Sequence, residues 1–331
     1  MAFRSCASEP DLFDSYLASP PKNEVLLELN SLIDWPALRR VVAPAYSADP
    51  RGREAFDPVL MIKMILLQRL YGLSDPAMES EAQDRLSFRQ FLGLTASDPV
   101  PDETTLVVFR KRLRSCNRLE ALQQAINSQL TRRGLMVREG SITVIDASLI
   151  PAATNPPTKK ERAAEQTRKD TEADFTVRGA KTHFGYKLHI AQDRQTGMIT
   201  AHEVTPASVH DSQVFEQLLD GSEAEVLADK AYDSRKRRQT LARRGTKASI
   251  LRKGTRSRGL SWWWAAHNKT LSRVRNFVES TFATLKLRQG CARAVYCGLE
   301  KVREQMTWSI LAFNLRRAIA LKPPERIFSE P

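Results

Sequence analysis

The pattern of hydrophobic residues changes near Gly140, and this change limits the possible folds more than any other feature of the chain. Before it, residues 23–135 contain short segments of helical type separated by capping residues. After it, β-branched runs that are typical of strands alternate with helical segments. This order predicts a mixed sheet flanked by helices. We therefore expect an α/β (α+β) chain with an all-helical N-terminal domain over 23–135 and a sheet-containing domain over 140–321.

The expected helical domain carries clear capping signals. Asp57 and Pro58 begin an apolar run that ends at Gly72. Residues 1–22 are expected to be a loosely ordered N-terminus. The helices expected over 58–72, 75–84 and 103–115 are compatible with a helix-turn-helix-like unit and equally with a plain bundle, so the sequence leaves both open.

The second domain is expected to contain five strands and four helices. The polar segment 151–179 contains prolines and mixed charges, which predicts an exposed loop, and residues 322–331 are expected to be a C-terminal tail. The expected strands are 141–150, 181–193, 198–207, 224–232 and 247–253, and the expected helices are 210–221, 234–245, 271–290 and 299–321.

Positive charge is concentrated in the last third of the chain. The whole chain has a net charge of +13, and residues 231–331 contain 23 Lys and Arg against 6 Asp and Glu. Such a surface favours a polyanionic partner, most often nucleic acid. No stretch is apolar enough for a membrane span or a signal peptide, and no CxxC pair indicates zinc. We therefore expect a cytoplasmic protein with reduced cysteines and no membrane partner.

Three carboxylates stand out in this basic context. Asp146 and Asp229 each end a predicted strand, and Glu279 is the only acid in the helix expected over 271–290. Taken singly, each has an ordinary interpretation: a turn or cap for the aspartates, and a surface ion pair with Arg275 for Glu279. Together they make an oxygen-ligand set suited to Mg²⁺ or Mn²⁺, and two such ions can promote phosphodiester chemistry.

The succession TVIDAS, HFGYKLHI, TPASVHDS, LADKAYDS and R-x3-E-x6-K closely resembles the bacterial DDE transposases of the insertion-sequence-five (IS-five) family, within the wider IS-four-like group. The resemblance extends from about Phe56 to Leu321. It implies an RNase H-like catalytic domain in which Asp146, Asp229 and Glu279 are catalytic and hold two divalent metal ions. It also implies that Arg275 and Lys286 contact transposon-end DNA. The family signature usually has tyrosine where this chain has Ser272.

Further basic and aromatic residues are candidates for DNA contacts. Lys187 either reaches a phosphate or is a solvated lysine. The run Trp262, Trp263 and Trp264 is expected in a loop before the Glu279 helix, where it either stacks on unpaired bases or packs against protein. Contacts with the DNA backbone are expected from Arg252, Lys253, Arg256 and Arg258.

The combined interpretation is a transposase that binds the terminal inverted repeats of an insertion sequence and joins its ends to target DNA, working as a homodimer on paired ends. Two alternatives remain open. One is an RNase H-like nuclease without strand transfer, and the other is a transposase-derived DNA-binding regulator without activity.

Overall fold

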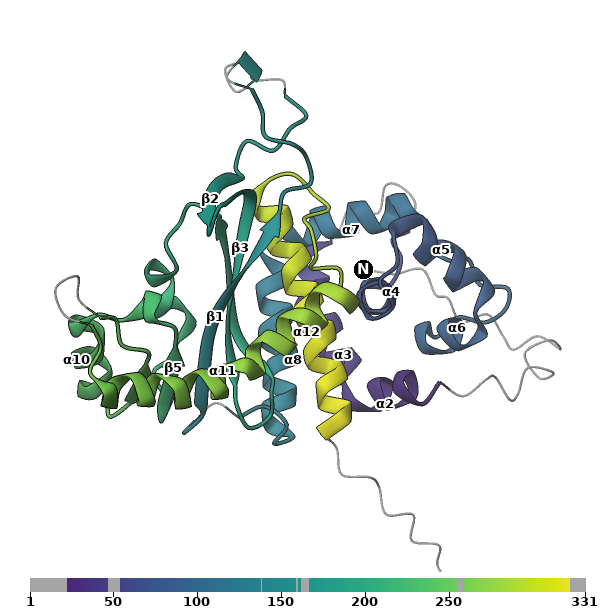
Figure 1. Cartoon of the computed structure of the whole chain (residues 1–331). Helices are drawn as coiled ribbons and strands as arrows, with labels where there is room; N and C mark the ends of the chain where they lie inside the picture. Colours follow the sequence, from purple (N-terminus) through teal and green to yellow (C-terminus); the bar gives the residue numbers. More distant parts are fainter. Residues whose placement is uncertain are drawn as a thin grey trace, which may run out of the picture.

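The computed structural model describes residues 23–46, 54–137, 139–158, 160–161, 167–254 and 259–321, and within these it leaves the side chains of residues 273–275 undescribed. The predictions for 1–22, 322–331, Arg256 and Arg258 therefore lie outside the described residues. Figure 1 shows a helical part beside a part that is built on a sheet, as the change of pattern near Gly140 predicts.

Helices account for the N-terminal part of the described chain. The apolar helix α4 lies in its core, and the Asp57 side chain accepts a hydrogen bond from the Val59 N–H at 2.7 Å, as expected of an N-cap. Gly72 ends α4 with φ of +67°, a conformation that favours glycine. The helices are α2 (Glu24–Leu32), α3 (Trp35–Val42), α4 (Pro58–Tyr71), α5 (Asp75–Asp84), α6 (Leu86–Leu92), α7 (Glu103–Ser115) and α8 (Arg118–Arg132), with a 3₁₀ turn η1 (Ala43–Ala45) after α3.

The sheet is mixed, as expected, but it has six strands rather than five. Strand β3 pairs antiparallel with β1, β2 and β4, whereas β5 runs parallel to β1, and β6 runs parallel to β5. An antiparallel meander followed by parallel strands is the arrangement of an RNase H-like sheet. The strands are β1 (Ile142–Pro151), β2 (Asp174–Arg178), β3 (Lys181–Asp193), β4 (Ile199–Pro206), β5 (Glu225–Ala228) and β6 (Lys247–Ile250).

The additional strand corrects the loop expected over 151–179. Residues 174–178 form β2, which pairs with the first residues of β3. Just before it, Asp170 is buried and accepts a hydrogen bond from the Tyr186 hydroxyl at 2.8 Å. The polar composition of this segment did not indicate the strand. The strand forms because β3 offers a free edge for pairing and because the buried Asp170 fixes the preceding residues.

The helices around the sheet differ from expectation in two places. The segment expected as a helix over 210–221 forms the 3₁₀ turns η2 (Asp211–Gln213) and η3 (Phe215–Leu218). The helix expected over 271–290 begins nine residues earlier, so that α11 is Trp262–Arg288 and its first turn contains the three tryptophans, capped by Ser261. The tryptophan run is thus helical and not a loop. The other elements are η4 (Lys230–Tyr232), α10 (Arg235–Arg243) and α12 (Leu299–Leu321).

Helix α12 joins the two parts of the molecule. Trp308, Leu311 and Leu315 on α12 pack with the N-terminal helices, whereas Met306 and Ile310 pack with β-strands and α11. Figure 1 shows α12 in yellow between the N-terminal helices and the sheet. Every residue from Glu304 to Ala312 is buried, so the middle of α12 is covered on all sides. The helical part therefore completes its core with a helix from the other end of the chain.

A buried ion pair also crosses this junction. Glu304 on α12 is only 2% exposed and pairs with Arg114 on α7. Burial raises the pKa of Glu304 above its ordinary value, although the hydrogen bond and charge of Arg114 act in the opposite direction. Arg114 thus compensates a carboxylate that would otherwise be costly to bury.

Loss of Arg114 should destabilise the fold in a pH-dependent way. Because the folded-state pKa of Glu304 is raised, burial of this carboxyl does not lower the free energy of unfolding below pH 4.5, its ordinary pKa. The free energy of unfolding falls as the pH rises from there through the raised pKa. We expect Arg114→Ala to lower the free energy of unfolding by about 3 kcal/mol near neutral pH, and by much less in acid. Urea unfolding across pH measures this. In a Glu304→Gln background the same substitution should lose its pH dependence, and a pH-independent loss in the wild-type background would contradict the prediction.

Gly185 is expected to tolerate no side chain. It lies in β3 opposite the end of β1, where a Cβ atom would overlap the Ile150 carbonyl oxygen and lie 2.7 Å from the Ala152 nitrogen. Gly185→Ala should therefore lower the free energy of unfolding by about 2–3 kcal/mol. The matched control is Gly259→Ala, because nothing lies within 4 Å of a Cβ atom there. Equal urea midpoints for the two variants would contradict the prediction, because they would show that β3 and the end of β1 accommodate a side chain at no cost in stability.

Candidate active site

The three acids that the sequence singled out line one cavity. This cavity has a volume of about 530 Å³ and lies where β1, β2, β3, η2 and α11 meet; we call it the acid cavity. Its lining residues are Asp146, Ala147, Ser148, Leu149, Thr176, Val177, Arg178, Lys187, Asp211, Asp229, Glu279, Phe282, Ala283 and Lys286.

Parallel pairing of β1 with β5 places the two aspartates side by side. Ile145 in β1 is the register partner of Ala228 in β5, and each aspartate is the next residue on its chain. Asp229 follows its strand directly, but Asp146 lies inside β1 and not at the strand end that the sequence predicted, because pairing with β3 continues the strand to Pro151. Neighbouring strands lie about 4.8 Å apart, so the two carboxylates start from adjacent positions. Each is also held by the backbone that follows it: Asp146 Oδ1 accepts from the Ala147 N–H at 2.9 Å, and Asp229 Oδ1 from the Lys230 N–H at 2.6 Å.

Glu279 reaches the cavity from α11, which packs against β1 and β5. Val278 and Leu285 are fully buried and anchor the helix on the core of the sheet-containing part. Glu279 itself is exposed, and it shares its face of α11 with Ala283 and Lys286. Because residues four and seven apart lie on one helix face, the packing that buries Val278 turns Glu279 toward the aspartates.

The cavity suits a hard divalent cation in the chemistry of its donors. Its described lining contains four carboxylates and no histidine or cysteine, and oxygen ligands are those that Mg²⁺ and Mn²⁺ prefer. Within the described part of the chain, however, no group of three or more Asp, Glu, His or Cys residues is close enough to hold a metal ion. The acids therefore share a cavity without being converged on one point.

The fourth carboxylate, Asp211, was not among the predicted site residues; it lies at the start of the segment expected as a helix over 210–221. It opens η2 and pairs with Lys187, whose Nζ lies 2.9 Å from Asp211 Oδ1 and 2.8 Å from the Val209 carbonyl oxygen. Lys187 is thus not a solvated lysine, because its side chain is only 14% exposed and lines the acid cavity. Its contact with a DNA phosphate stays a prediction. The position of Asp211 in the TPASVHDS motif was the available signal.

Two more basic side chains line the cavity. Arg178, at the end of β2, was not anticipated, since β2 itself was not. Lys286 was anticipated, and burial together with the charge of Arg178 lowers its pKa below the ordinary value. The cavity therefore brings three cations, including Lys187, close to its four acids.

Among the other DNA candidates with described side chains, Arg252, Lys253 and the three tryptophans are not part of the acid-cavity lining. Trp262 and Trp263 are 83% and 59% exposed, whereas Trp264 is half-buried beneath the Arg252 guanidinium, which lies 4.5 Å from its ring centroid. The backbone N–H of Lys253 donates to Asp233 Oδ2 at 3.1 Å. Nothing is described for the side chain of Arg275, although its backbone belongs to α11.

Among the described residues, no helix has the length and apolar character needed to cross a membrane.

Comparison with known proteins assigns both parts of the chain. A family profile described as "Transposase domain (DUF772)" matches residues 14–112, and one described as "Transposase DDE domain" matches residues 138–315. One similar solved structure is the piggyBac transposase synaptic complex with hairpin DNA. It is 9% identical in sequence, the match covers 87% of this chain and 72% of that chain, and the TM-score is 0.44. Because the DDE profile alone spans more than half of the sequence, the chain belongs to the DDE transposases, in the IS-four/IS-five-like superfamily.

Proposed function

We propose that this chain is a Mg²⁺-dependent transposase of the IS-five family that binds the terminal inverted repeats of an insertion sequence, cleaves DNA there and transfers the ends to target DNA. The observation that carries the proposal is the acid cavity. Asp146, Asp229 and Glu279 come from three separate elements, and all three line it. A structural role explains one strand-end aspartate, but it does not explain three acids in one polar cavity.

In this proposal the three acids hold two divalent ions, Mg²⁺ or Mn²⁺. Such ions supply activation of an attacking oxygen and stabilisation of the leaving oxygen in an in-line displacement at phosphorus. The chain contributes orientation, because backbone N–H groups hold both aspartates on adjacent parallel strands. Arg178, Lys187 and Lys286 surround the acids with positive charge that would attract and position the DNA phosphates.

DNA outside the cavity would be held by the basic last third of the chain. Arg275, Arg252, Lys253, Arg256 and Arg258 are proposed to contact phosphates. The exposed rings of Trp262 and Trp263 offer faces on which unpaired bases can stack. Trp264 has a different role in this proposal, because its ring supports the Arg252 guanidinium. We propose that two copies act together in the cytoplasm, one on each end of the element.

The proposal is tested with duplexes that carry the DNA flanking the reading frame. Incubation with Mg²⁺ and a target plasmid should give joined products, and short inverted repeats should bracket the frame. Cleavage without joining would instead favour an RNase H-like nuclease. Binding without cleavage would favour a DNA-binding regulator.

Neutral substitution of each acid should abolish the chemistry without abolishing DNA binding. We expect Asp146→Asn, Asp229→Asn and Glu279→Gln each to lower the cleavage rate by at least about a hundredfold, because each removes a charged metal ligand. Gel assays of cleavage and of binding, run side by side, measure both. Exposed acids outside the cavity supply controls, and Asp84→Asn and Glu300→Gln should cleave at the wild-type rate. Full cleavage by any of the three cavity variants would disprove its place at the metal site.

The tryptophan run should separate into two roles. Trp262→Ala with Trp263→Ala should weaken binding of single-stranded DNA by about tenfold or more, since each stacked base contributes about 1–3 kcal/mol. The unfolding midpoint of this double variant should change less than that of Trp264→Ala, because Trp262 and Trp263 are exposed and the Trp263 ring contacts only Trp264 and His267 among the described rings. Trp264→Ala should instead lower the midpoint, because the Arg252 guanidinium loses its aromatic support. Fluorescence anisotropy and thermal unfolding test this division, and wild-type DNA affinity in the double variant would exclude the stacking role.

A further inference from the structure

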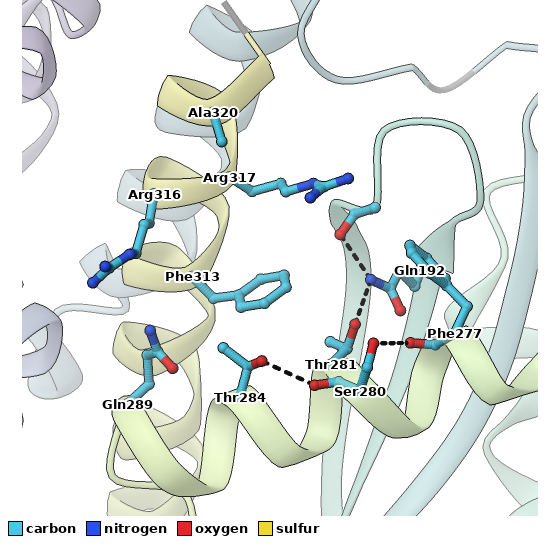
Figure 2. A pocket seen from close by; sticks show the side chains of 11 residues that line it. Gln192, Phe277, Ser280, Thr281, Thr284, Gln289, Phe313, Arg316, Arg317 and Ala320 are labelled. Atoms are coloured by element: carbon cyan, nitrogen blue, oxygen red, sulfur yellow. Dashed lines mark hydrogen bonds between the residues drawn. The ribbon is translucent and has the colours of Figure 1, made fainter. Parts of the chain in front are cut away.

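A second cavity lies on the face of α11 that points away from the acids. It has a volume of about 240 Å³, and residues from the end of β3, from α11 and from α12 line it (Figure 2). On α11, Ser280, Thr281 and Thr284 face this cavity, which we call the back cavity, whereas Glu279 and Lys286 face the acid cavity. At 100° per residue these are opposite sides of one helix. The two cavities are therefore distinct and share a wall.

Two buried amides in the back cavity have unused hydrogen-bonding atoms. Gln289 is fully buried, and within the described part of the chain neither its Nε2 nor its Oε1 has a hydrogen-bond partner. Gln192 is also fully buried; its Nε2 donates to the Gly197 carbonyl oxygen at 2.7 Å and to Thr281 Oγ1 at 2.8 Å, but its Oε1 has no such partner. Such unsatisfied groups are uncommon in native proteins, because a buried polar atom without a partner is destabilising. One donor and two acceptors of residues that line the back cavity thus have no partner among the described residues.

Aromatic and cationic groups complete the lining. The half-buried rings of Phe277 on α11 and Phe313 on α12 both line the cavity, and Figure 2 shows the Phe313 ring pointing into it. Arg317 extends across one side of the cavity, where its Nε donates to the Thr196 carbonyl oxygen at 2.7 Å. The described lining contains no acid, so no negative charge there would repel an anionic group.

We propose that the back cavity binds a nucleotide. The base would lie against the phenylalanine rings, with its polar edge bonded to the Gln289 amide and to Gln192 Oε1, and its phosphate would lie on Arg317. Aromatic faces, amide edges and a guanidinium are the groups that recognise a base and its phosphate. The nucleotide is either a free monophosphate or a base unstacked from bound DNA, since both present this chemistry. The choice of a nucleotide over another planar anion rests on the proposed action on DNA.

The test measures binding rather than cleavage. The full-length protein is titrated calorimetrically with each of the deoxynucleoside monophosphates, and separately with end duplexes in which 2-aminopurine replaces single adenines. Gln289→Leu should weaken the response by about tenfold, because the edge of the base loses its partner. The unfolding midpoint of the unliganded variant should not fall, since leucine removes an unsatisfied buried amide. Gln90→Leu, at an exposed position on α6, is the matched control and should bind as the wild type does.

Each result of the binding test either supports or overturns nucleotide binding in the back cavity. A monophosphate response that Gln289→Leu weakens identifies a free-nucleotide site, and a fluorescence increase on the duplex alone, weakened in the same way, identifies an unstacked base. No response to either probe, or one that Gln289→Leu leaves unchanged, overturns the proposal and leaves a cavity that holds only water. Asp146→Asn should retain nucleotide binding while it loses cleavage. Failure of the proposed strand transfer and failure of this inference are thereby distinguished.

Discussion

Parallel pairing between β1 and β5 is the constraint on which the candidate active site depends. The register that joins Ile145 to Ala228 brings together residues more than eighty positions apart and makes Asp146 and Asp229 neighbours. A shift of one residue would turn one aspartate to the other face of the sheet. Val144 and Leu227 pack in the core on one face of the sheet, and Ile145 and Val226 pack in the core on the other, so a shift would disrupt the packing on both faces. Core packing and site geometry thus depend on the same pairing.

Two long helices connect this pairing to the rest of the molecule in different ways. Helix α11 packs one stripe on the sheet and presents Glu279 beside the aspartates, so its burial sets the direction of the third carboxylate. Helix α12 is buried on nearly all sides, between α11 and the sheet on one flank and the N-terminal helices on the other. The matches to two transposase profiles therefore correspond to parts of the chain that share a core through α12, and not to independently packed units.

Polar groups inside the molecule fall into two kinds. Glu304, Asp170 and Gln192 Nε2 have partners on other elements, and each contact ties together segments that are distant in sequence. Gln289 has lost its contact with water without gaining a partner for its amide from the described chain. Trp308 Nε1 and Asn127 Oδ1 also have no partner within the described chain, but Gln289 differs from them because it lines the back cavity. Glu279 is a different case, because it is exposed to solvent although it lines the acid cavity.

The sequence alone determined what local patterns can report. Hydrophobic period and caps located α4, β1, β3 and β4, and strand-end position together with motif order identified Asp146, Asp229 and Glu279. Tertiary structure decided what depends on partners distant in the chain. It added β2, because a polar strand forms only where an edge accepts it, and it extended α11 back through the tryptophans. It also withdrew Lys187 from solvent by pairing it with Asp211. Composition and spacing describe a residue's neighbours along the chain, whereas a cavity is made by residues that only folding brings together.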